Sequence, residues 1–207
     1  MAFLRELFYP PTVAVVPVFS RRRRSFIFWL WSCVFVAILG VLSVFFSLSL
    51  WIYYPPKEEP YSSNAVMVIA GYDDGRHSLG ADYIESGIAE NFVVSNPAGT
   101  RDKIGSAYCR GIDRPSKVSH SWCVKPKPAT TAGEALAMGA LAEEQGWSSA
   151  TVVTGRTHAR RVKTMFEECA NLDVAVTYPD TVDTSRIRDQ IIHEIGGYIK
   201  FWMTYPC

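Results

Sequence analysis

The sequence predicts an α/β protein in which a single N-terminal transmembrane helix precedes a three-layer α/β/α domain. Three observations lead to this prediction. An uncharged apolar segment runs from Phe26 to Ile52. After it, short apolar segments alternate with longer helical ones, and residues typical of turns follow most of the short segments. Alternation of strands and helices is typical of a mainly parallel sheet with helices on both faces.

The overall composition is that of an ordinary globular chain. The 207 residues are 48% hydrophobic and 20% charged, and the net charge is +1. A nucleic-acid-binding domain usually carries a clear excess of Lys and Arg. The charge balance therefore argues against a nucleic-acid partner.

The apolar segment is long enough to cross a bilayer, which takes about 20 residues. Trp29 and Trp31 lie near one end and Trp51 near the other, as expected of aromatic rings at the two membrane interfaces. A cleaved signal peptide is the alternative, but its apolar core is only about 7 to 15 residues long. We therefore expect residues 25–54 to form an uncleaved transmembrane helix that anchors the chain in the lipid bilayer.

Charged residues on either side of this helix predict its orientation. Arg21 to Arg24 precede it, whereas Lys57 is followed by Glu58 and Glu59. Because basic flanks stay in the cytoplasm, we expect residues 1–24 to be a basic cytoplasmic tail. The C-terminal part is then extracytoplasmic, in a single-pass protein of the cell membrane. The opposite topology would give a cytoplasmic nucleotide-binding domain, and protease treatment of intact cells distinguishes the two.

A polar, proline-containing linker at residues 55–63 is expected to lead into one domain at 64–207. Four apolar segments predict strands that are covered on both faces: 65–70, 91–95, 151–154 and 173–176. Helices are expected at 131–145, before a glycine stop, and at 184–202, where isoleucine recurs every four residues. Residues 97–130 lack clear periodicity, which favours a long binding loop or lid. The predicted domain is thus Rossmann-like, with a mainly parallel sheet.

Cysteine usage agrees with an extracytoplasmic domain. Cys33 lies in the apolar segment, and the other four cysteines lie on the side that is expected to be oxidising. Cys109 and Cys123 flank one irregular segment, so a disulfide between them is the preferred pairing, and Cys169 with Cys207 is possible but less supported. No two cysteines have C-x-x-C spacing, and none lies beside a histidine at ligand spacing. We therefore expect no metal site.

Parallel α/β sheets bind ligands at the carboxyl ends of their strands, and polar residues follow three of the predicted strands. The candidate ligand-binding residues are Gly71, Asp73 and Asp74 after the first strand, Ser95 and Asn96 after the second, and Thr154 and Thr157 after the third. The sequence does not indicate a cofactor for these positions.

The third of these strands leads into a helix start with an unusual charge pattern. Residues 156–161 contain one histidine and three arginines, whereas two glutamates lie toward the other end of the helix. Cations near a helix N-terminus are unfavourable by about 0.3 to 1 kcal/mol each, so we expect a bound anion to compensate them. Adjacent helical positions diverge by about 100°. His158 and Arg161 are therefore assigned to the site and Arg160 to solvent.

A second helix start, at Thr130 and Thr131, has two interpretations. Thr131 as N-cap with Glu134 three residues later fits a capping box, in which each side chain satisfies a backbone N–H group of the other. Alternatively, Glu134 faces His158, and the two perform general acid–base chemistry. The sequence leaves both interpretations open, and both threonines are candidate ligand-binding residues.

Four segments together resemble a known family. They are Ala-Val-Met-Val-Ile-Ala-Gly at residues 65–71, Thr-Thr-Ala-Gly-Glu-Ala at 130–135, Val-Val-Thr-Gly-Arg-Thr-His-Ala-Arg-Arg at 152–161 and Ile-His-Glu-Ile-Gly-Gly-Tyr-Ile-Lys at 192–200. In order and spacing they resemble the YdcF, SanA and ElyC family over about residues 64–202. The resemblance implies a Rossmann-like domain, often membrane anchored, that is associated in bacteria with cell-envelope biogenesis or barrier integrity.

The family's motifs map onto single residues of this chain. Its Thr-x-x-Glu-Ala helix start falls on Thr131 and Glu134, and its Val-Thr-Ser-x-x-His-x-x-Arg turn falls on Thr154, His158 and Arg161. Two positions depart from the pattern. A glycine at 155 stands where the family commonly has serine, and residues 72–75 read Tyr-Asp-Asp-Gly in place of a glycine-rich loop.

Two functions from different classes follow. The first is a membrane-anchored protein that binds a phosphate-bearing or other anionic envelope ligand at the carboxyl edge of the sheet, with Arg161 as a contact. The alternative is an enzyme, a hydrolase or transferase, that acts on a phosphate-bearing envelope precursor with His158 and Glu134 as acid and base. No Ser-His-Asp signature is present in the sequence.

Overall fold

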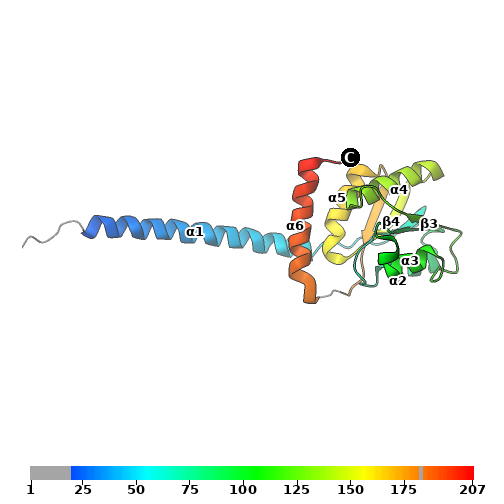
Figure 1. The fold of residues 1–207 in the computed structure, drawn as a ribbon, viewed down its shortest axis with the longest axis horizontal. Coiled ribbons are helices and arrows are strands. Elements are labelled where there is room, and N and C mark those ends of the chain that lie inside the picture. The colour runs from blue at the N-terminus through cyan, green and yellow to red at the C-terminus, as the bar shows by residue number, and fades with distance from the viewer. Residues whose placement is uncertain (1–19, 182–183) are drawn as a thin grey trace, which may run out of the picture. The chain divides into compact units, whose positions relative to one another are not determined.

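The computed structural model describes residues 20–181 and 184–207 (Figure 1). The predicted cytoplasmic tail therefore lies almost entirely outside the described residues. The chain divides into two compact units, Met1–Ser47 and Leu48–Cys207. The first contains most of helix α1 (Ser20–Tyr53), and the second contains the last turns of that helix together with the whole α/β domain.

Helix α1 is uniformly apolar over its central part. Ser25–Tyr53 has a mean hydropathy of 2.6 over its most apolar window, and it is the one described helix that is long and apolar enough to cross a membrane. Its side chains are largely exposed on all sides, except Ile52 near its C-terminal end, which is buried. The predicted apolar segment lies within it. By length and composition the helix is compatible with a membrane anchor or a signal sequence.

The domain is built on a five-stranded, wholly parallel sheet with strand order β3-β2-β1-β4-β5. The strands are β1 (Ala65–Val68), β2 (Asn91–Ser95), β3 (His120–Val124), β4 (Ser149–Val153) and β5 (Asp173–Thr177). The predicted α/β class and parallel sheet are confirmed. The chain extends the sheet to one side of β1 with β2 and to the other with β4, so the strand order reverses at β1, which is where such sheets bind ligands.

Helices cover both faces of the sheet, which gives three layers (Figure 1). The helices are α2 (Arg76–Glu85), α3 (Lys103–Cys109), α4 (Thr131–Gln145), α5 (Ala159–Cys169) and α6 (Ile187–Thr204), with short 3-10 turns η1 (Gly99–Arg101), η2 (Arg156–His158) and η3 (Thr184–Arg186). Side chains alternate along each strand. Met67 therefore packs toward α4 and α5, whereas Val66 and Val68 pack toward α2 and α3.

The predicted long loop at residues 97–130 is wrong, because this segment contains η1, α3 and strand β3. Strand β3 was missed because it is an edge strand with largely exposed side chains, so its residues lack the apolar pattern of the inner strands. It pairs with β2 through the backbone, from His120 opposite Asn91 to Val124 opposite Ser95.

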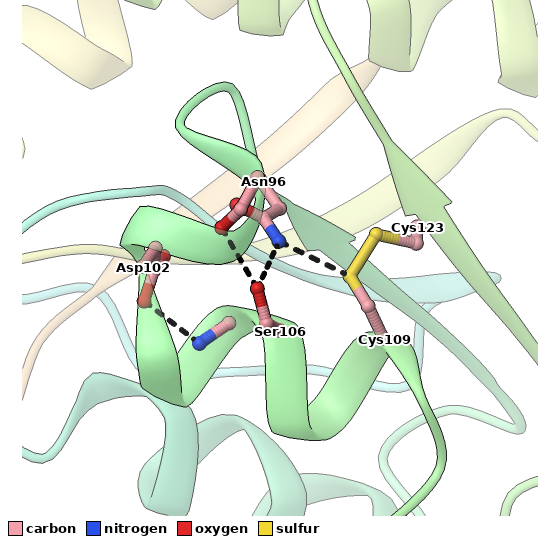
Figure 2. Close-up of a disulfide and its surroundings, with 7 residues drawn as sticks. Asn96, Asp102, Ser106, Cys109 and Cys123 are labelled. Atoms are coloured by element: carbon pink, nitrogen blue, oxygen red, sulfur yellow. Dashed lines mark hydrogen bonds between the residues drawn. A yellow bond between two sulfur atoms is a disulfide. The ribbon is translucent and has the colours of Figure 1, made fainter.

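Two disulfides each link the C-terminal end of a helix to another segment of the domain. The predicted Cys109–Cys123 bridge is present and ties the end of α3 to β3 (Figure 2). A second bridge joins Cys169, the last residue of α5, to Cys207, beyond the end of α6. This pairing was the less supported one in the sequence, because 38 residues separate the two cysteines. Their proximity depends on how α5 and α6 pack.

Candidate functional site

A cavity of about 780 Å³ lies at the carboxyl edge of the sheet. Its walls come from the segments that follow β1 and β4, the start of α4, the turn η2 and one face of α6. Most predicted site residues line it: Gly71, Asp73, Asp74, Thr130, Thr131, Glu134, Thr157, His158 and Arg161. The structure thus brings the two predicted helix starts and the first strand end together around one space.

Glu134 is buried under the start of α4, with only 4% of its surface exposed. Its Oε1 atom accepts hydrogen bonds from the Ser95 hydroxyl (2.5 Å) and from the Ala70 N–H group (3.0 Å). Burial raises the pKa of Glu134 to about 7, and these hydrogen bonds only partly oppose the shift. A carboxyl group with this pKa exchanges a proton near neutral pH, which is the property that general acid–base catalysis needs.

The capping-box interpretation of Glu134 is wrong. The N-cap is Thr130, whose hydroxyl accepts from the Gly133 N–H group (3.2 Å), and the Glu134 side chain turns toward the sheet instead. Gly133 is also required here, because a Cβ atom at this position would lie 2.0 Å from the Pro128 carbonyl oxygen. The helix start therefore fits tightly against residue 128, and this contact positions Glu134.

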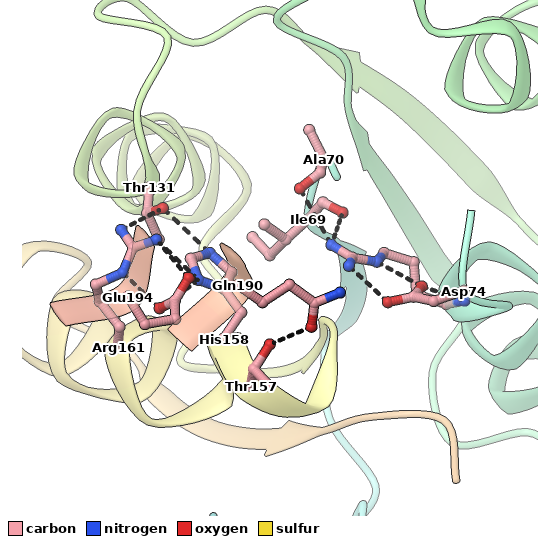
Figure 3. A network of polar contacts seen from close by, with 10 residues as sticks. Ile69, Ala70, Asp74, Thr131, Thr157, His158, Arg161, Gln190 and Glu194 are labelled. Carbon is pink, nitrogen blue, oxygen red and sulfur yellow. Dashed lines mark hydrogen bonds and ion pairs between the residues drawn. The ribbon is translucent and has the colours of Figure 1, made fainter. Parts of the chain in front are cut away.

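His158 is held at both ring nitrogens (Figure 3). Its Nδ1 atom lies 2.9 Å from a Glu194 carboxylate oxygen and its Nε2 atom 3.2 Å from the Thr131 hydroxyl. An ionised carboxylate can only accept, so Nδ1 carries the proton and Nε2 accepts from Thr131. Burial lowers the pKa of His158, and the nearby Arg161 adds to this, whereas Glu194 opposes it. The imidazole is therefore held neutral, with a basic nitrogen on the hydroxyl side.

Arg161 forms the strongest contact of this group. Its Nε and Nη2 atoms donate to the two Glu194 oxygens (2.7 and 3.0 Å), and its Nη1 atom donates to the Thr131 hydroxyl (3.2 Å). Burial alone would raise the pKa of Glu194, but the hydrogen bonds from His158 and Arg161 and the charge of the Arg161 guanidinium outweigh it and lower the pKa to about 2. Gly197 leaves the necessary room, since a Cβ atom there would lie 2.7 Å from Arg161 Nε.

Glu194 changes the interpretation of the charged helix start. The anion that compensates His158 and Arg161 is a carboxylate of the protein, supplied by α6. The sequence did not single out Glu194, because 33 residues separate it from Arg161. Its neighbour His193 is exposed, so this part of the helix gave no sign that Glu194 itself is buried. The resemblance was the one available signal, because Glu194 lies within the last of its four segments.

Arg76 is a second residue that the sequence did not single out. It is buried, and its guanidinium forms two hydrogen bonds with the Asp74 carboxylate (2.7 and 2.8 Å) and another with the Ala70 carbonyl oxygen (3.1 Å). Cβ atoms at Gly71 and Gly155 would lie 2.3 and 2.6 Å from this guanidinium. Glycine at 155, where the family has serine, is therefore explained by the space that Arg76 takes.

The remaining predicted residues have other environments. Ser95 reaches the site only through Glu134. Asn96 lies outside the cavity lining and donates to Ser106 Oγ (3.1 Å) beside the Cys109–Cys123 bridge (Figure 2). Thr154 is also outside the lining, whereas the Thr157 hydroxyl donates to Gln190 (3.0 Å) in the cavity wall. Asn96 and Thr154 therefore do not contribute to the cavity lining.

The other two arginines of this segment, Arg156 and Arg160, contact different parts of the protein. Arg160 lies outside the cavity lining, as predicted, and at the surface it donates to the carbonyl oxygens of Trp51 (2.7 Å) and Tyr54 (3.1 Å), which caps the end of α1. Arg156 lines the cavity and donates to the Asp180 carbonyl oxygen (3.1 Å). Its Nε atom is buried and has no hydrogen-bond partner among the described residues.

No protein-family model, curated protein or solved structure matches this chain. In the part of the chain that the structure describes, no group of three His, Cys, Asp or Glu side chains is arranged to hold a metal ion. The side chains that line the cavity are therefore the basis for assigning its chemistry.

Proposed function

We propose that this chain is a single-pass membrane protein whose α/β domain lies outside the cytoplasm and binds an anionic, phosphate-bearing ligand in the cavity. The apolar helix α1 supports the membrane anchor. The four arginines before it and the two disulfides of the domain support the orientation, because disulfides form in oxidising compartments.

The resemblance to the YdcF, SanA and ElyC family extends this proposal to a role in cell-envelope biogenesis or barrier integrity. Its support is that residues from all four segments line one cavity: Gly71, Glu134, His158 and Glu194, which come from parts of the chain far apart in sequence. Segments that merely shared a helical or strand pattern would have no reason to place their polar residues together.

One observation gives the main support for an anionic ligand. Arg156 lines the cavity, and its buried Nε atom has no hydrogen-bond partner among the residues that the structure describes, so the protein itself does not use every donor of this guanidinium. An unpaired buried donor costs about 1 to 3 kcal/mol. Contacts with the Asp180 carbonyl oxygen and with the Tyr178 ring, 5.6 Å from the guanidinium carbon, hold the side chain in place.

The charge of the cavity lining agrees with an anion. Glu194 neutralises Arg161, and Asp74 neutralises Arg76. Apart from Arg186, which has interactions of its own, the other charged side chains in the lining are Arg156 and Lys200 against Asp73 and Glu134. With a pKa raised to about 7, Glu134 is only partly ionised at neutral pH. The cavity lining therefore carries no excess of negative charge that would repel an anion once its internal pairs are counted.

Titration calorimetry of the full chain in lipid nanodiscs tests this proposal, with inorganic phosphate and pyrophosphate as the probes. We expect Arg156→Gln to weaken pyrophosphate binding by about tenfold or more, since a hydrogen bond to a charged group contributes about 1.5 to 3 kcal/mol. Arg188→Gln is the matched control, because Arg188 is exposed and outside the cavity lining. Equal affinity of the Arg156 variant and the wild type would contradict the proposal.

A second candidate function is supported by the two titratable groups. Glu134 exchanges a proton near pH 7, and neutral His158 presents Nε2 to the Thr131 hydroxyl while Glu194 orients its other nitrogen. A hydroxyl, an imidazole and a carboxylate in this order form the arrangement by which hydrolases and transferases activate an oxygen nucleophile. The enzyme would act on a phosphate-bearing precursor.

Turnover of a panel of phosphate monoesters and diesters by the purified full chain tests this candidate. We expect His158→Ala and Glu134→Gln each to lower the rate by about a hundredfold or more, as for loss of a general acid or base. His120→Ala, an exposed histidine on β3, serves as the control. If no substrate is turned over, or if all variants react equally fast, the cavity only binds its ligand.

A further inference from the structure

Helix α6 exposes large apolar side chains on the face opposite the cavity. Phe201 and Glu194 are buried beneath the helix, whereas Ile192, Ile199 and Met203 are 54%, 56% and 81% exposed. At about 100° per residue these three exposed positions fall within roughly 40° of arc. We name Ile192, Ile199, Trp202 and Met203 the α6 apolar stripe; Trp202, 56% exposed, lies at its margin.

A surface helix of a soluble domain is normally polar on its outward face. Contiguous exposed apolar side chains of this kind mark a surface that contacts another protein or a membrane. The stripe is not needed for the cavity, because none of its four residues lines it. The stripe is therefore a surface distinct from the cavity, and its binding partner can differ from the ligand of the cavity.

The position of α6 indicates the covering surface. Trp51 lies in the last turns of α1 and belongs to the same compact unit as the domain, and its ring packs 5.6 Å from that of Tyr198 on α6. The Arg160 guanidinium lies 4.5 Å from the Trp51 ring and binds the Trp51 and Tyr54 carbonyl oxygens. Helix α6 is thus fixed beside the residues where the apolar segment ends, and Trp and Tyr at such ends lie at the headgroup level of a bilayer.

We propose that α6 is an interfacial helix. Its apolar stripe lies in the headgroup region of the extracytoplasmic leaflet of the membrane that α1 spans. Helices with one apolar face lie in this way, about 5 to 10 Å into the boundary between headgroups and acyl chains. Lys200 is exposed beside the stripe, and its long stem suits contact with lipid phosphates. The opposite face of the same helix supplies Glu194 and Phe201 to the cavity, so membrane contact and the cavity wall share one helix.

This inference rests on the membrane anchor of the proposed function but not on its ligand. The test uses the full chain in nanodiscs of equal parts phosphatidylcholine and phosphatidylglycerol, with nitroxide spin labels. Labels are placed at Ile199→Cys and Met203→Cys in a Cys33→Ser background. The matched control is Ile112→Cys, at an exposed apolar residue between α3 and β3.

We expect labels at 199 and 203 to be several-fold more accessible to oxygen than to a water-soluble nickel complex, and the label at 112 to show the reverse. Accessibility at 199 and 203 equal to that at 112 would overturn the proposal. Protection from both reagents that disappears when each nanodisc holds one chain would assign the stripe to a second copy, and would also overturn it.

Cys33, an exposed free cysteine on α1, separates this failure from failure of the anchor. In the otherwise wild-type chain a label at Cys33 should report hydrocarbon. If it does and the labels at 199 and 203 report water, α1 spans the membrane and only the α6 proposal is wrong. If the Cys33 label also reports water, the membrane anchor itself is wrong and the α6 proposal falls with it.

Discussion

The two glutamates of the cavity are equally buried and have opposite electrostatic properties. Glu134 is 4% exposed and Glu194 is 3% exposed. Yet burial raises the pKa of Glu134 to about 7, whereas hydrogen bonds from His158 and Arg161 and the charge of Arg161 overcome burial and lower the pKa of Glu194 to about 2. The difference lies in the partners. Glu134 binds a hydroxyl and a backbone N–H group, and Glu194 binds a guanidinium with two hydrogen bonds.

The comparison indicates a division of roles within one site. The α6 side, with Glu194, is an ionised, internally neutralised cluster that fixes the His158 ring and Arg161. The α4 side, with Glu134, keeps a carboxyl group that changes protonation near neutral pH. An arrangement in which two titratable groups have widely separated pKa values is common at sites that bind or transform ligands, because one group then stays ionised while the other can exchange a proton.

The largest expected effect comes from removing the charge of Glu194. Glu194→Gln leaves the Arg161 guanidinium buried without a counter-ion, and breaking a buried pair in this way costs about 3 to 5 kcal/mol. The measurement is the free energy of unfolding in urea of the detergent-solubilised full chain. Asp189→Asn is the matched control on α6: its partner Arg188 is 85% exposed, so the change should be under about 1 kcal/mol. Similar losses in the two variants would mean that Glu194 is not a structural counter-ion.

A second, somewhat smaller effect is the pH dependence that Glu134 contributes, which a comparison with a variant isolates because His77 and His158, whose pKa values are lowered from 6.5, are present in both chains. Its folded-state pKa of about 7 lies above the ordinary value of 4.5, so the folded chain retains a proton that the unfolded chain releases as pH rises from 4.5 to 7. The contribution of Glu134 to stability is therefore present below pH 4.5 and is lost toward pH 7, by on the order of 3 kcal/mol.

Glu134→Gln should remove this dependence. The stability advantage of the wild type over the variant is expected to be about 3 kcal/mol greater at pH 4.5 than at pH 7.5, measured as unfolding free energies. Glu194 does not interfere in this window, because its pKa is depressed and its contribution is lost only as pH falls from 4.5 toward 2. A wild-type-to-variant difference that is constant between pH 4.5 and 7.5 would show that Glu134 is ionised in the folded chain.

The smallest of the three effects compares the backbones of the two helices. Gly133→Ala places a Cβ atom 2.0 Å from the Pro128 carbonyl oxygen, and the start of α4 must shift. We expect a loss of about 1 to 3 kcal/mol, as for overpacking. Gly196 on α6 has no atom within 4 Å of a built Cβ, so Gly196→Ala should be neutral or stabilising by up to about 1 kcal/mol. Thermal unfolding of both variants measures the pair; equal stabilities would imply that residue 128 moves freely away from α4.

The sequence by itself determined what depends on local pattern. The uncharged segment predicted α1, apolar runs predicted four of the five strands, and the Thr-x-x-Glu pattern predicted the start of α4 to within one residue. The Cys109–Cys123 disulfide could also be predicted from the sequence, since only 14 residues separate its cysteines. Burial of a continuous apolar run, or of one helical stripe, needs no knowledge of the neighbouring element. For the same reason the edge strand β3, with its exposed side chains, was missed.

Only the tertiary structure decided which charges meet. Strand order places the ends of β1 and β4 side by side, and the packing of α6 over them brings Glu194 to Arg161 across 33 residues. The sequence could show that the helix start after β4 required a negative charge, but not that the protein supplies it from its own last helix. It likewise could not show that Glu134 turns from its own helix start toward Ser95 and Ala70. Electrostatic energy depends on distance in space and on burial, and neither is fixed by separation along the chain.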